Sequence, residues 1–265
     1  MIKLQRAGTL TVSAASGCVV HEGLLHVVAD DDAALHSYTL DGTLRRVLPL
    51  FPDVMPADEK ARKKVKPDLE ALAVLPDGAL LAIGSGSTDR RRRAALVRAD
   101  AVQVIDCTAL FERLSREFEQ LNIEGLAVHR GQLVLGQRGN GAKRENALVR
   151  LKLDSLLRPE SIESIERLEL PELEGVPLSL TDLALSGDGS LHFSAAAEDT
   201  DDPYLDGECT GSVVGALDGT RVLWTRPVSE VVKVEGLTHH SGDQWFLVCD
   251  ADDPHVKAPL FTARF

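Results

Sequence analysis

Three glutamates recur in the same short apolar phrase of this chain, and their spacing is the feature of the sequence that bears most directly on chemistry. The phrases are Leu69-Glu70-Ala71-Leu72, Ile123-Glu124-Gly125-Leu126 and Val234-Glu235-Gly236-Leu237. The step from Glu124 to Glu235 is close to twice the step from Glu70 to Glu124. If the repeats surround a common axis, the carboxylates converge and raise one another's pKa unless a cation lies among them. The pattern therefore predicts a cation site at the axis.

The skipped copies of the phrase complete a ring of five positions. The same step taken back from Glu70 reaches Ser16, and Thr181 lies close to the midpoint between Glu124 and Glu235. The predicted metal ligands are Ser16, Glu70, Glu124, Thr181 and Glu235. Ca²⁺ suits this ring because it takes roughly six to eight oxygen ligands in a flexible geometry, whereas Mg²⁺ demands a stricter octahedron. Mg²⁺ or another divalent cation remains an alternative to Ca²⁺.

Two alternatives to this ring stay open. Asp182 replaces Thr181 as the ligand if its strand is shifted by one residue. Lys233, which shares a strand face with Glu235, and Lys66, which is close to Glu70 in sequence, could neutralise the carboxylates directly. The ring would then be a set of structural ion pairs.

The elements that must position this ring are predicted to be short strands. A period near 50 residues with several strands in each unit is typical of a propeller. The second unit shows the pattern most plainly, with strands at 70–75, 79–84, 94–99 and 101–106 and a tight turn at Pro76-Asp77-Gly78. We therefore expect residues 1–265 to form a single all-β domain, a five-bladed β-propeller.

The ends of the chain and one insertion complete the predicted fold. The last unit lacks one strand, and residues 2–7 can supply it by pairing with residues 259–264, which closes the ring and covers two sheet edges. Apolar residues at helical spacing predict one inserted amphipathic helix over residues 108–120, with Thr108 as its N-cap. They are Leu110, Phe111, Leu114 and Phe118. The basic run within residues 51–67 is interpreted as a solvated loop.

The chain direction places the loops between the second and third strands of each unit beside the ring. Units two and three contribute basic loops at residues 85–93 and 137–144, and the other units contribute acidic loops at 30–32, 198–202 and 250–253. Such a rim suits an anionic ligand held by arginines, with a metal or a base on the acidic side. The residues predicted to bind the substrate are Arg90, Arg138 and Arg144. Those predicted to hold a metal or to act as the base are Asp199, Asp202, Asp250 and Asp252. The alternative is that these opposite charges pair across blades.

Composition narrows the function classes. The formal net charge of −12 would repel nucleic acid and anionic membranes, so neither is expected as a partner. No apolar run approaches the roughly 20 residues that span a bilayer, and the first residues lack the apolar stretch of a signal peptide, so we expect a cytoplasmic protein. The four cysteines show no Cys-x-x-Cys spacing and indicate neither a zinc site nor a disulfide framework. The oligomeric state is left open.

Longer motifs carry a resemblance to a known group of proteins. They are Lys64-Val65-Lys66-Pro67-Asp68-Leu69-Glu70, Gly84-Ser85-Gly86-Ser87, Gln137-Arg138-Gly139-Asn140-Gly141, Ala197-Glu198-Asp199-Thr200-Asp201-Asp202 and Asp250-Ala251-Asp252-Asp253-Pro254. Over its whole length the chain resembles a family of uncharacterised bacterial β-propeller proteins, which implies a fold and no activity. The order hydroxyl, Glu, Glu, hydroxyl, Glu around the ring is similar to the central calcium site of the calcium-activated apyrases. That likeness is confined to the ring and implies calcium rather than nucleotide hydrolysis.

Two function hypotheses follow. The first is a calcium-binding propeller that acts as a metal-dependent hydrolase of a small anionic substrate, which would be phosphoester-, nucleotide- or lactone-like. The second is a non-catalytic propeller that binds a ligand or a protein and holds a structural cation.

Overall fold

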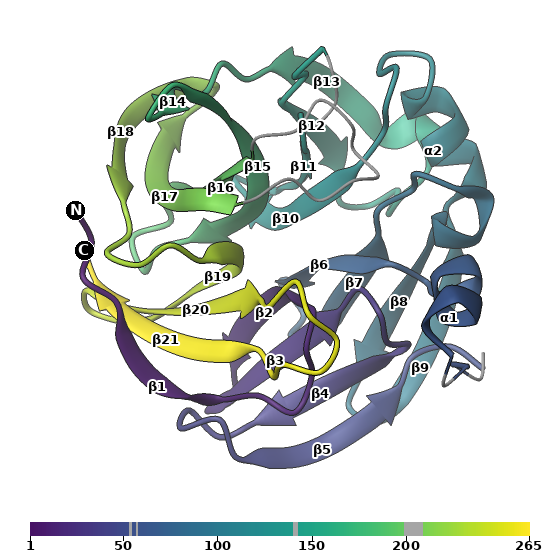
Figure 1. The fold of residues 1–265 in the computed structure, drawn as a ribbon. Coiled ribbons are helices and arrows are strands. Elements are labelled where there is room, and N and C mark those ends of the chain that lie inside the picture. Colours follow the sequence, from purple (N-terminus) through teal and green to yellow (C-terminus); the bar gives the residue numbers. More distant parts are fainter. Residues whose placement is uncertain (53–54, 57, 140–142, 199–208) are drawn as a thin grey trace.

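Five antiparallel sheets surround a central axis in a computed structural model of the protein (Figure 1). The structure describes residues 1–265 except residues 53, 54, 57, 140–142 and 199–208. Each sheet is one blade, numbered here in chain order from the blade that begins with β2. The predicted all-β, five-bladed propeller is confirmed.

Each blade follows the same order, from an inner strand near the axis to an outer strand. Blade 1 contains β2 (Ala15–His21), β3 (Leu24–Ala29), β4 (Ala34–Tyr38) and β5 (Leu44–Pro49). Blade 2 contains β6 (Leu69–Val74), β7 (Leu80–Gly84), β8 (Arg93–Arg98) and β9 (Ala101–Asp106). Blade 3 contains β10 (Ile123–His129), β11 (Gln132–Gln137), β12 (Ala147–Lys152) and β13 (Ile162–Arg167).

Blades 4 and 5 depart slightly from this order. Blade 4 contains β15 (Val176–Leu185), β16 (Leu191–Glu198), β17 (Cys209–Asp218) and β18 (Arg221–Pro227), with the two-residue β14 (Glu172–Leu173) paired to the start of β15. Blade 5 contains β19 (Lys233–Ser241), β20 (Gln244–Asp250), β21 (Pro259–Arg264) and β1 (Gln5–Thr9). The N-terminal strand is therefore the outer strand of the last blade.

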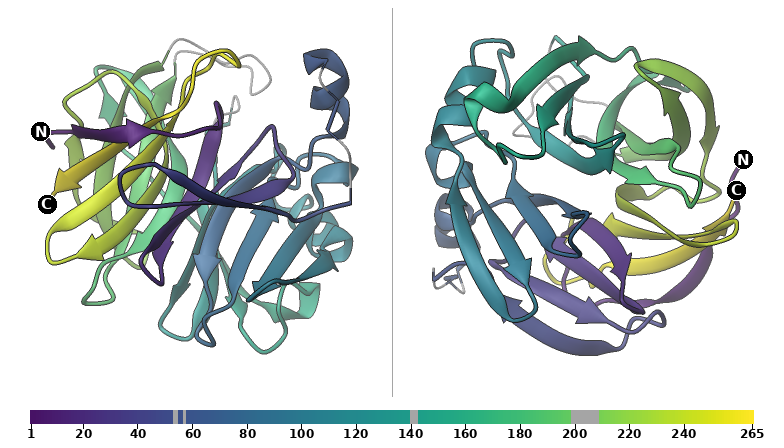
Figure 2. Two further views of the ribbon diagram at one scale, coloured as in Figure 1. Left: turned by 90° about the horizontal axis from the view of Figure 1, so that it is seen from below. Right: turned by 180° about the vertical axis from the view of Figure 1, so that it is seen from behind.

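The pairing of β1 with β21 closes the ring. Gln5 lies opposite Thr262, and Thr9 lies opposite Pro259. Figure 2 shows the two strands side by side near the chain ends. The predicted closure is confirmed, although β1 begins at Gln5 rather than at Ile2, because Ile2 forms a separate parallel bridge with Val228. An otherwise open edge of β21 is covered in this way.

Two helices lie on the same side of the ring, beside blades 2 and 3 (Figure 1). The predicted helix is present as α2 (Thr108–Leu114), in which Leu110, Phe111 and Leu114 are buried, and Phe118 is buried beyond its end. It ends before residue 120, and its N-cap is Cys107 rather than Thr108, because the Asp106 side chain accepts a hydrogen bond from the Thr108 N–H. The interpretation of residues 51–67 as a loop is wrong in part. Residues Glu59–Val65 form α1, whose N-cap Asp58 accepts a hydrogen bond from the Ala61 N–H.

The hydrophobic core lies between neighbouring blades. The inner strands β2, β6, β10, β15 and β19 pack on one another around the axis, and small residues allow them to come close. A Cβ atom added at Gly236 would lie 2.5 Å from the Ser16 carbonyl oxygen, and one at Gly17 would lie 2.7 Å from the Leu72 nitrogen. Glycine at these positions therefore sets the width of the ring. None of the helices in the described ranges is long and apolar enough to cross a membrane.

Candidate functional site

A β-bulge marks the predicted ring position in every inner strand. The pairing register shifts between Leu69 and Ala71, so Glu70 has no direct partner on β7. The same shift occurs at Glu124 in β10, at Thr181 in β15 and at Glu235 in β19, and in β2 it spans Ser16 and Gly17. A bulge redirects a side chain out of the regular alternation of the strand. The recurring phrase is thus a recurring bulge, and equivalent residues of five strands converge.

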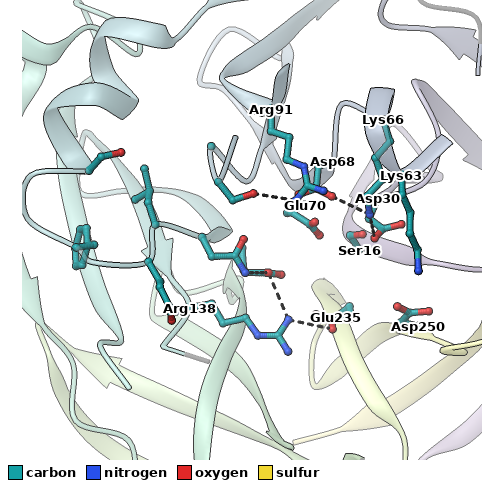
Figure 3. Close-up of a pocket in the computed structure, with 18 of the residues that line it drawn as sticks. Ser16, Asp30, Lys63, Lys66, Asp68, Glu70, Arg91, Arg138, Glu235 and Asp250 are labelled. Carbon is teal, nitrogen blue, oxygen red and sulfur yellow. Dashed lines mark hydrogen bonds and ion pairs between the residues drawn. The ribbon is translucent and has the colours of Figure 1, made fainter. Parts of the chain in front are cut away.

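A pocket of about 490 Å³ lies at one end of the axis, and four of the five ring residues line it (Figure 3). They are Ser16, Glu70, Glu124 and Glu235. The Thr181 hydroxyl is instead fully buried beside the next blade, where it donates to the Val234 carbonyl oxygen at 2.7 Å. Asp182 is also buried, and its carboxylate accepts from the N–H groups of Leu183 and Leu237. Both residues therefore connect inner strands.

Two basic residues pair with the ring glutamates in the half of the pocket formed by blades 3, 4 and 5. Arg138 follows β11, and its guanidinium lies 3.4 Å from both Glu124 Oε1 and Glu235 Oε1 and also donates to Glu198. The Lys233 ammonium lies 3.2 Å from both Glu198 Oε1 and Glu235 Oε1. The alternative pairing of Lys233 with Glu235 is thus confirmed. All five side chains are at most 7 % exposed, so these are buried ion pairs.

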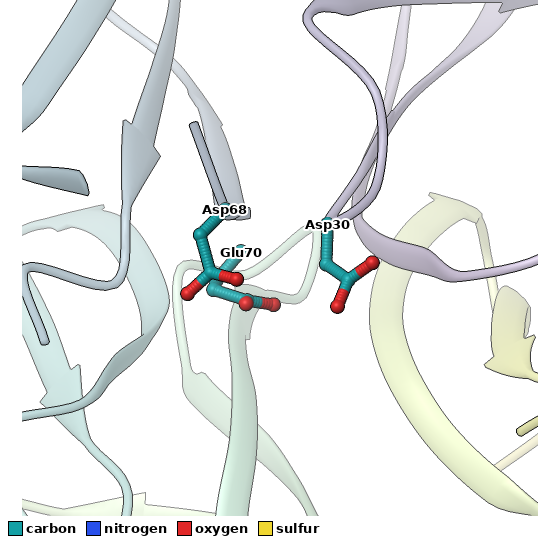
Figure 4. A group of neighbouring side chains, drawn as sticks. All are labelled: Asp30, Asp68 and Glu70. Atoms are coloured by element: carbon teal, nitrogen blue, oxygen red, sulfur yellow. The ribbon is translucent and has the colours of Figure 1, made fainter. Parts of the chain in front are cut away.

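The half formed by blades 1 and 2 carries a different set of groups. Ligand oxygens of Asp30, Asp68 and Glu70 all lie within 4.8 Å of one another (Figure 4). The Lys66 ammonium bridges Asp30 and Asp68, at 2.5 and 2.8 Å, and the Arg91 guanidinium lies 2.7 Å from Asp68. Lys66 thus pairs with these two aspartates rather than with Glu70. Among the described residues, no hydrogen bond or ion pair reaches the Glu70 carboxylate.

Asp68 is held in an unusual conformation. Its φ of 55° is left-handed, which costs a residue other than glycine on the order of 1–3 kcal/mol and is common at functional sites. Besides Lys66 and Arg91, the Ser85 hydroxyl donates to Asp68 at 2.5 Å. These three contacts fix the buried carboxylate beside Glu70 and offset the backbone strain.

The pKa values of the pocket carboxylates are shifted by burial and by neighbouring charges. Burial raises the pKa of Glu70 well above its ordinary value, and the charges of Glu124, Asp68 and Asp30 add to the rise. Burial also raises the pKa of Glu124 to about 8 and that of Asp250 to about 7. Glu198 differs, because Arg138 and Lys233 outweigh burial and lower its pKa. A further cation near Glu70, Glu124 or Asp250 would therefore stabilise the charged form of these carboxylates.

The other predicted site residues are spread over the molecule. Asp250 lines the central pocket, as expected for the end of a second strand, and Asp252 lies 3.4 Å from the Lys233 ammonium. Arg90 is exposed outside this pocket, and Arg144 lines a neighbouring cavity of about 160 Å³. Asp199 and Asp202 lie outside the described residues. Binding of a substrate or metal by these residues stays a prediction.

Sequence reasoning missed the roles of Asp68, Arg91 and Glu198, and one signal was available. In the regular alternation of a strand, residues two positions apart lie on the same face. The residues two positions before the ring residues are Ala14, Asp68, Asn122, Ser179 and Lys233. Asp68, Asn122 and Lys233 line the pocket, and Asn122 donates to Glu124 at 2.7 Å. Applying the repeat to this second position would have identified Asp68. Arg91 and Glu198 had no such signal, because they belong to loops and strand ends that differ between blades.

Comparison with known proteins places the chain in a family. The model of a family of unknown function (DUF6929) matches residues 11–265. The chain belongs to this family. No curated protein matches it.

Solved structures similar to this DUF6929 member include several enzymes. A glutaminyl cyclase from Myxococcus xanthus is 12% identical with a TM-score of 0.60, over 99% of this chain and 96% of that one. A luciferin-regenerating enzyme is 14% identical with a TM-score of 0.54, over 100% and 96%. A gluconolactonase from Xanthomonas campestris is 13% identical with a TM-score of 0.50, over 98% and 89%. Likeness at this identity shows the fold alone.

Proposed function

We propose that this DUF6929 protein is a divalent-cation-dependent hydrolase of a small anionic substrate. The observation that carries the proposal is the convergence of Asp30, Asp68 and Glu70 within 4.8 Å at the pocket. Carboxylate oxygens are the ligands that Ca²⁺ and Mg²⁺ prefer, and Ca²⁺ tolerates an irregular set. Lys66 and Arg91 pair with Asp30 and Asp68, so a divalent cation would offset the charge of Glu70, whose carboxylate has no partner among the described residues.

The neighbouring groups suit hydrolysis of an ester, phosphoester or lactone. When bound, a divalent cation polarises a carbonyl or phosphoryl oxygen and lowers the pKa of water. Asp250 faces the same pocket with a pKa raised by burial to about 7, which suits a general base near neutral pH. Lys63 and Arg91, which also line the pocket, are placed to orient the negative group of the substrate. A lactone-like substrate agrees with the gluconolactonase among the structural neighbours.

A second candidate is a non-catalytic binding propeller in which the same cation is structural. The contacts of Lys66 favour it, because this ammonium already joins Asp30 of blade 1 to Asp68 of blade 2. A cation beside Glu70 would strengthen the same connection. Both functions require a bound cation, and only turnover distinguishes them.

The test combines cation binding with a substrate screen. We expect the melting temperature of the EDTA-treated protein to rise on addition of Ca²⁺, and Glu70→Gln to abolish the rise. Lactones, phosphoesters and nucleotides are then screened with Ca²⁺ and with EDTA. Activity should require the cation and be lost in Asp250→Asn, whereas Glu172→Gln, an exposed residue of β14, serves as the matched control. A wild-type melting temperature that does not change on addition of Ca²⁺ or Mg²⁺ would contradict the proposal. Cation binding without turnover would favour the second candidate.

A further inference from the structure

Arg138 and Lys233 lie among three buried carboxylates. Glu124 and Glu235 stand at the same bulge as Glu70, and Glu198 reaches them from the end of β16. The three carboxylates come from three different blades and converge on one guanidinium. Carboxylates that converge in this way without a protein cation are a site for a hard metal ion.

The contacts show that the carboxylates in this half of the pocket are paired with cations, although not every buried polar atom has a hydrogen-bond partner. The Glu235 side chain is 6 % exposed, and its Oε2 atom is buried without a hydrogen-bond partner among the described residues. Within the same part of the chain, Arg138 Nε is also buried without a partner, and the Arg138 guanidinium contacts Glu124 and Glu235 only at 3.4 Å. A buried carboxylate oxygen without a donor costs free energy that a closer cation would recover. The Arg138 guanidinium therefore pairs with these carboxylates but leaves some of their buried polar atoms without hydrogen bonds.

The two halves of the pocket differ through two backbone positions rather than through the ring. At the end of the second strand, blades 1, 2 and 3 have Asp30, Ser85 and Arg138 as the first residue after the strand, and blade 5 has Asp250 as its last residue. Arg138 supplies the only positive charge among these four. Two residues before the ring, blade 5 has Lys233 where blade 2 has Asp68. At these two positions Arg138 and Lys233 place cations beside Glu124 and Glu235. Asp30 and Asp68 place carboxylates beside Glu70.

We propose that Arg138 and Lys233 are specificity-determining residues that substitute for a metal ion between Glu124, Glu198 and Glu235. They exclude a divalent cation from that side and leave the Asp30–Asp68–Glu70 side to bind one. The second statement rests on the proposed function. The first stands on the contacts of Arg138 and Lys233 alone, so the two can fail separately.

The experiment counts Ca²⁺ ions bound by Arg138→Met and Lys233→Met with isothermal titration calorimetry. Each variant removes a charge and retains a side chain of similar length, and we expect each to bind one Ca²⁺ more per chain than the wild type. Its melting temperature should then rise by about 5–10 °C when Ca²⁺ reaches 100 times its Kd. Arg138→Lys keeps the charge and should bind no additional ion. Arg45→Met, at an exposed arginine of β5, is the matched control and should behave as the wild type.

A purely structural role for Arg138 predicts a different result. The variants would then lose stability equally with and without Ca²⁺, and folded variants that bind no additional ion would overturn the proposal. If a variant does not fold in EDTA, recovery of its fold in Ca²⁺ supports the proposal, and failure of both variants to fold in either condition contradicts it. Wild-type protein that binds no Ca²⁺, together with an Arg138→Met variant that binds one, would reject the proposed function and retain this inference.

Discussion

Replacing Glu124 with glutamine should remove one defined pH dependence from the stability of the cation-free protein. Burial, against the opposing charge of Arg138, raises the pKa of Glu124 to about 8 from an ordinary value of 4.5, and Glu235 adds to the rise. Between these values the folded protein keeps a proton that the unfolded chain has released. The folded state therefore binds more protons, and stability falls as the pH increases through this window.

The expected magnitude follows from the width of that window. The stabilisation that protonated Glu124 contributes is fully present below pH 4.5, the pKa of this side chain in the unfolded chain. It is lost progressively as the pH rises toward the folded pKa of about 8, and pH 7 lies inside this window. At roughly 1.4 kcal/mol per pH unit, the loss of unfolding free energy by pH 7 is about 3 kcal/mol. Glutamine does not titrate, so Glu124→Gln lacks this loss. Its amide oxygen can still accept from the Asn122 side chain, which now donates to Glu124 Oε1 at 2.7 Å.

Urea unfolding in EDTA from about pH 5 to about pH 8 measures the effect, provided that the m-values stay equal. Glu198→Gln is the matched control, because Glu198 contacts the same Arg138 but has a lowered pKa. Its charge stabilises the fold above the unfolded pKa of 4.5 and is lost only as the pH falls through the lower folded pKa. We therefore expect Glu198→Gln to be less stable throughout this range, with the pH slope of the wild type. Equal slopes in Glu124→Gln and the wild type would refute the reasoning.

Three further predictions concern the ring and its closure. Thr181→Val removes the hydrogen bonds of the Thr181 hydroxyl with Val234 and Ser194 and should cost about 1–3 kcal/mol of unfolding free energy, while the response of the melting temperature to Ca²⁺ stays as in the wild type. If the melting temperature of Thr181→Val no longer responds to Ca²⁺, Thr181 is a metal ligand, as the sequence predicted. Removal of residues 1–10 takes away β1 and the buried Ile2, Leu4 and Leu10. Calorimetry should show a melting temperature lower by on the order of 10 °C. Light scattering should show that the protein self-associates through the exposed edge of β21. Leu126→Ala, at a residue 1 % exposed in an inner strand, should cost about 2–5 kcal/mol in urea unfolding, and a cost below about 1 kcal/mol would contradict the tight inner packing.

The sequence could predict the features that repeat. A bulge that must recur in every inner strand leaves the same phrase at Glu70, Glu124 and Glu235, and its period identifies five blades and one ring. Closure by β1 was also predictable, because the last unit lacked a strand and the N-terminus had an unpaired one. These inferences need only local patterns and the requirement that backbone groups and sheet edges be paired.

The sequence could not predict which charges pair. Arg138 belongs to a basic loop and was expected to bind a ligand at the rim, yet it is 5 % exposed between carboxylates of blades 3, 4 and 5. Its partners Glu198 and Glu235 are 60 and 97 residues away in the chain. Likewise, α1 has only two apolar residues, Ala61 and Val65, so it lacks the stripe that identified α2. Its Asp58 cap was the one local signal.

The divergence between blades explains why such a ring can carry a function. Five equivalent backbone positions would by themselves give a symmetric site, and symmetric carboxylates would repel one another around a single ion. In this chain Thr181 joins two inner strands, Arg138 and Lys233 neutralise Glu124 and Glu235, and Glu70 is the one ring glutamate whose carboxylate has no partner among the described residues. These departures from the repeat leave an unpaired ring carboxylate only in blade 2 among the described residues. The repeat therefore builds the pocket, and its exceptions decide which side of the pocket can bind a cation.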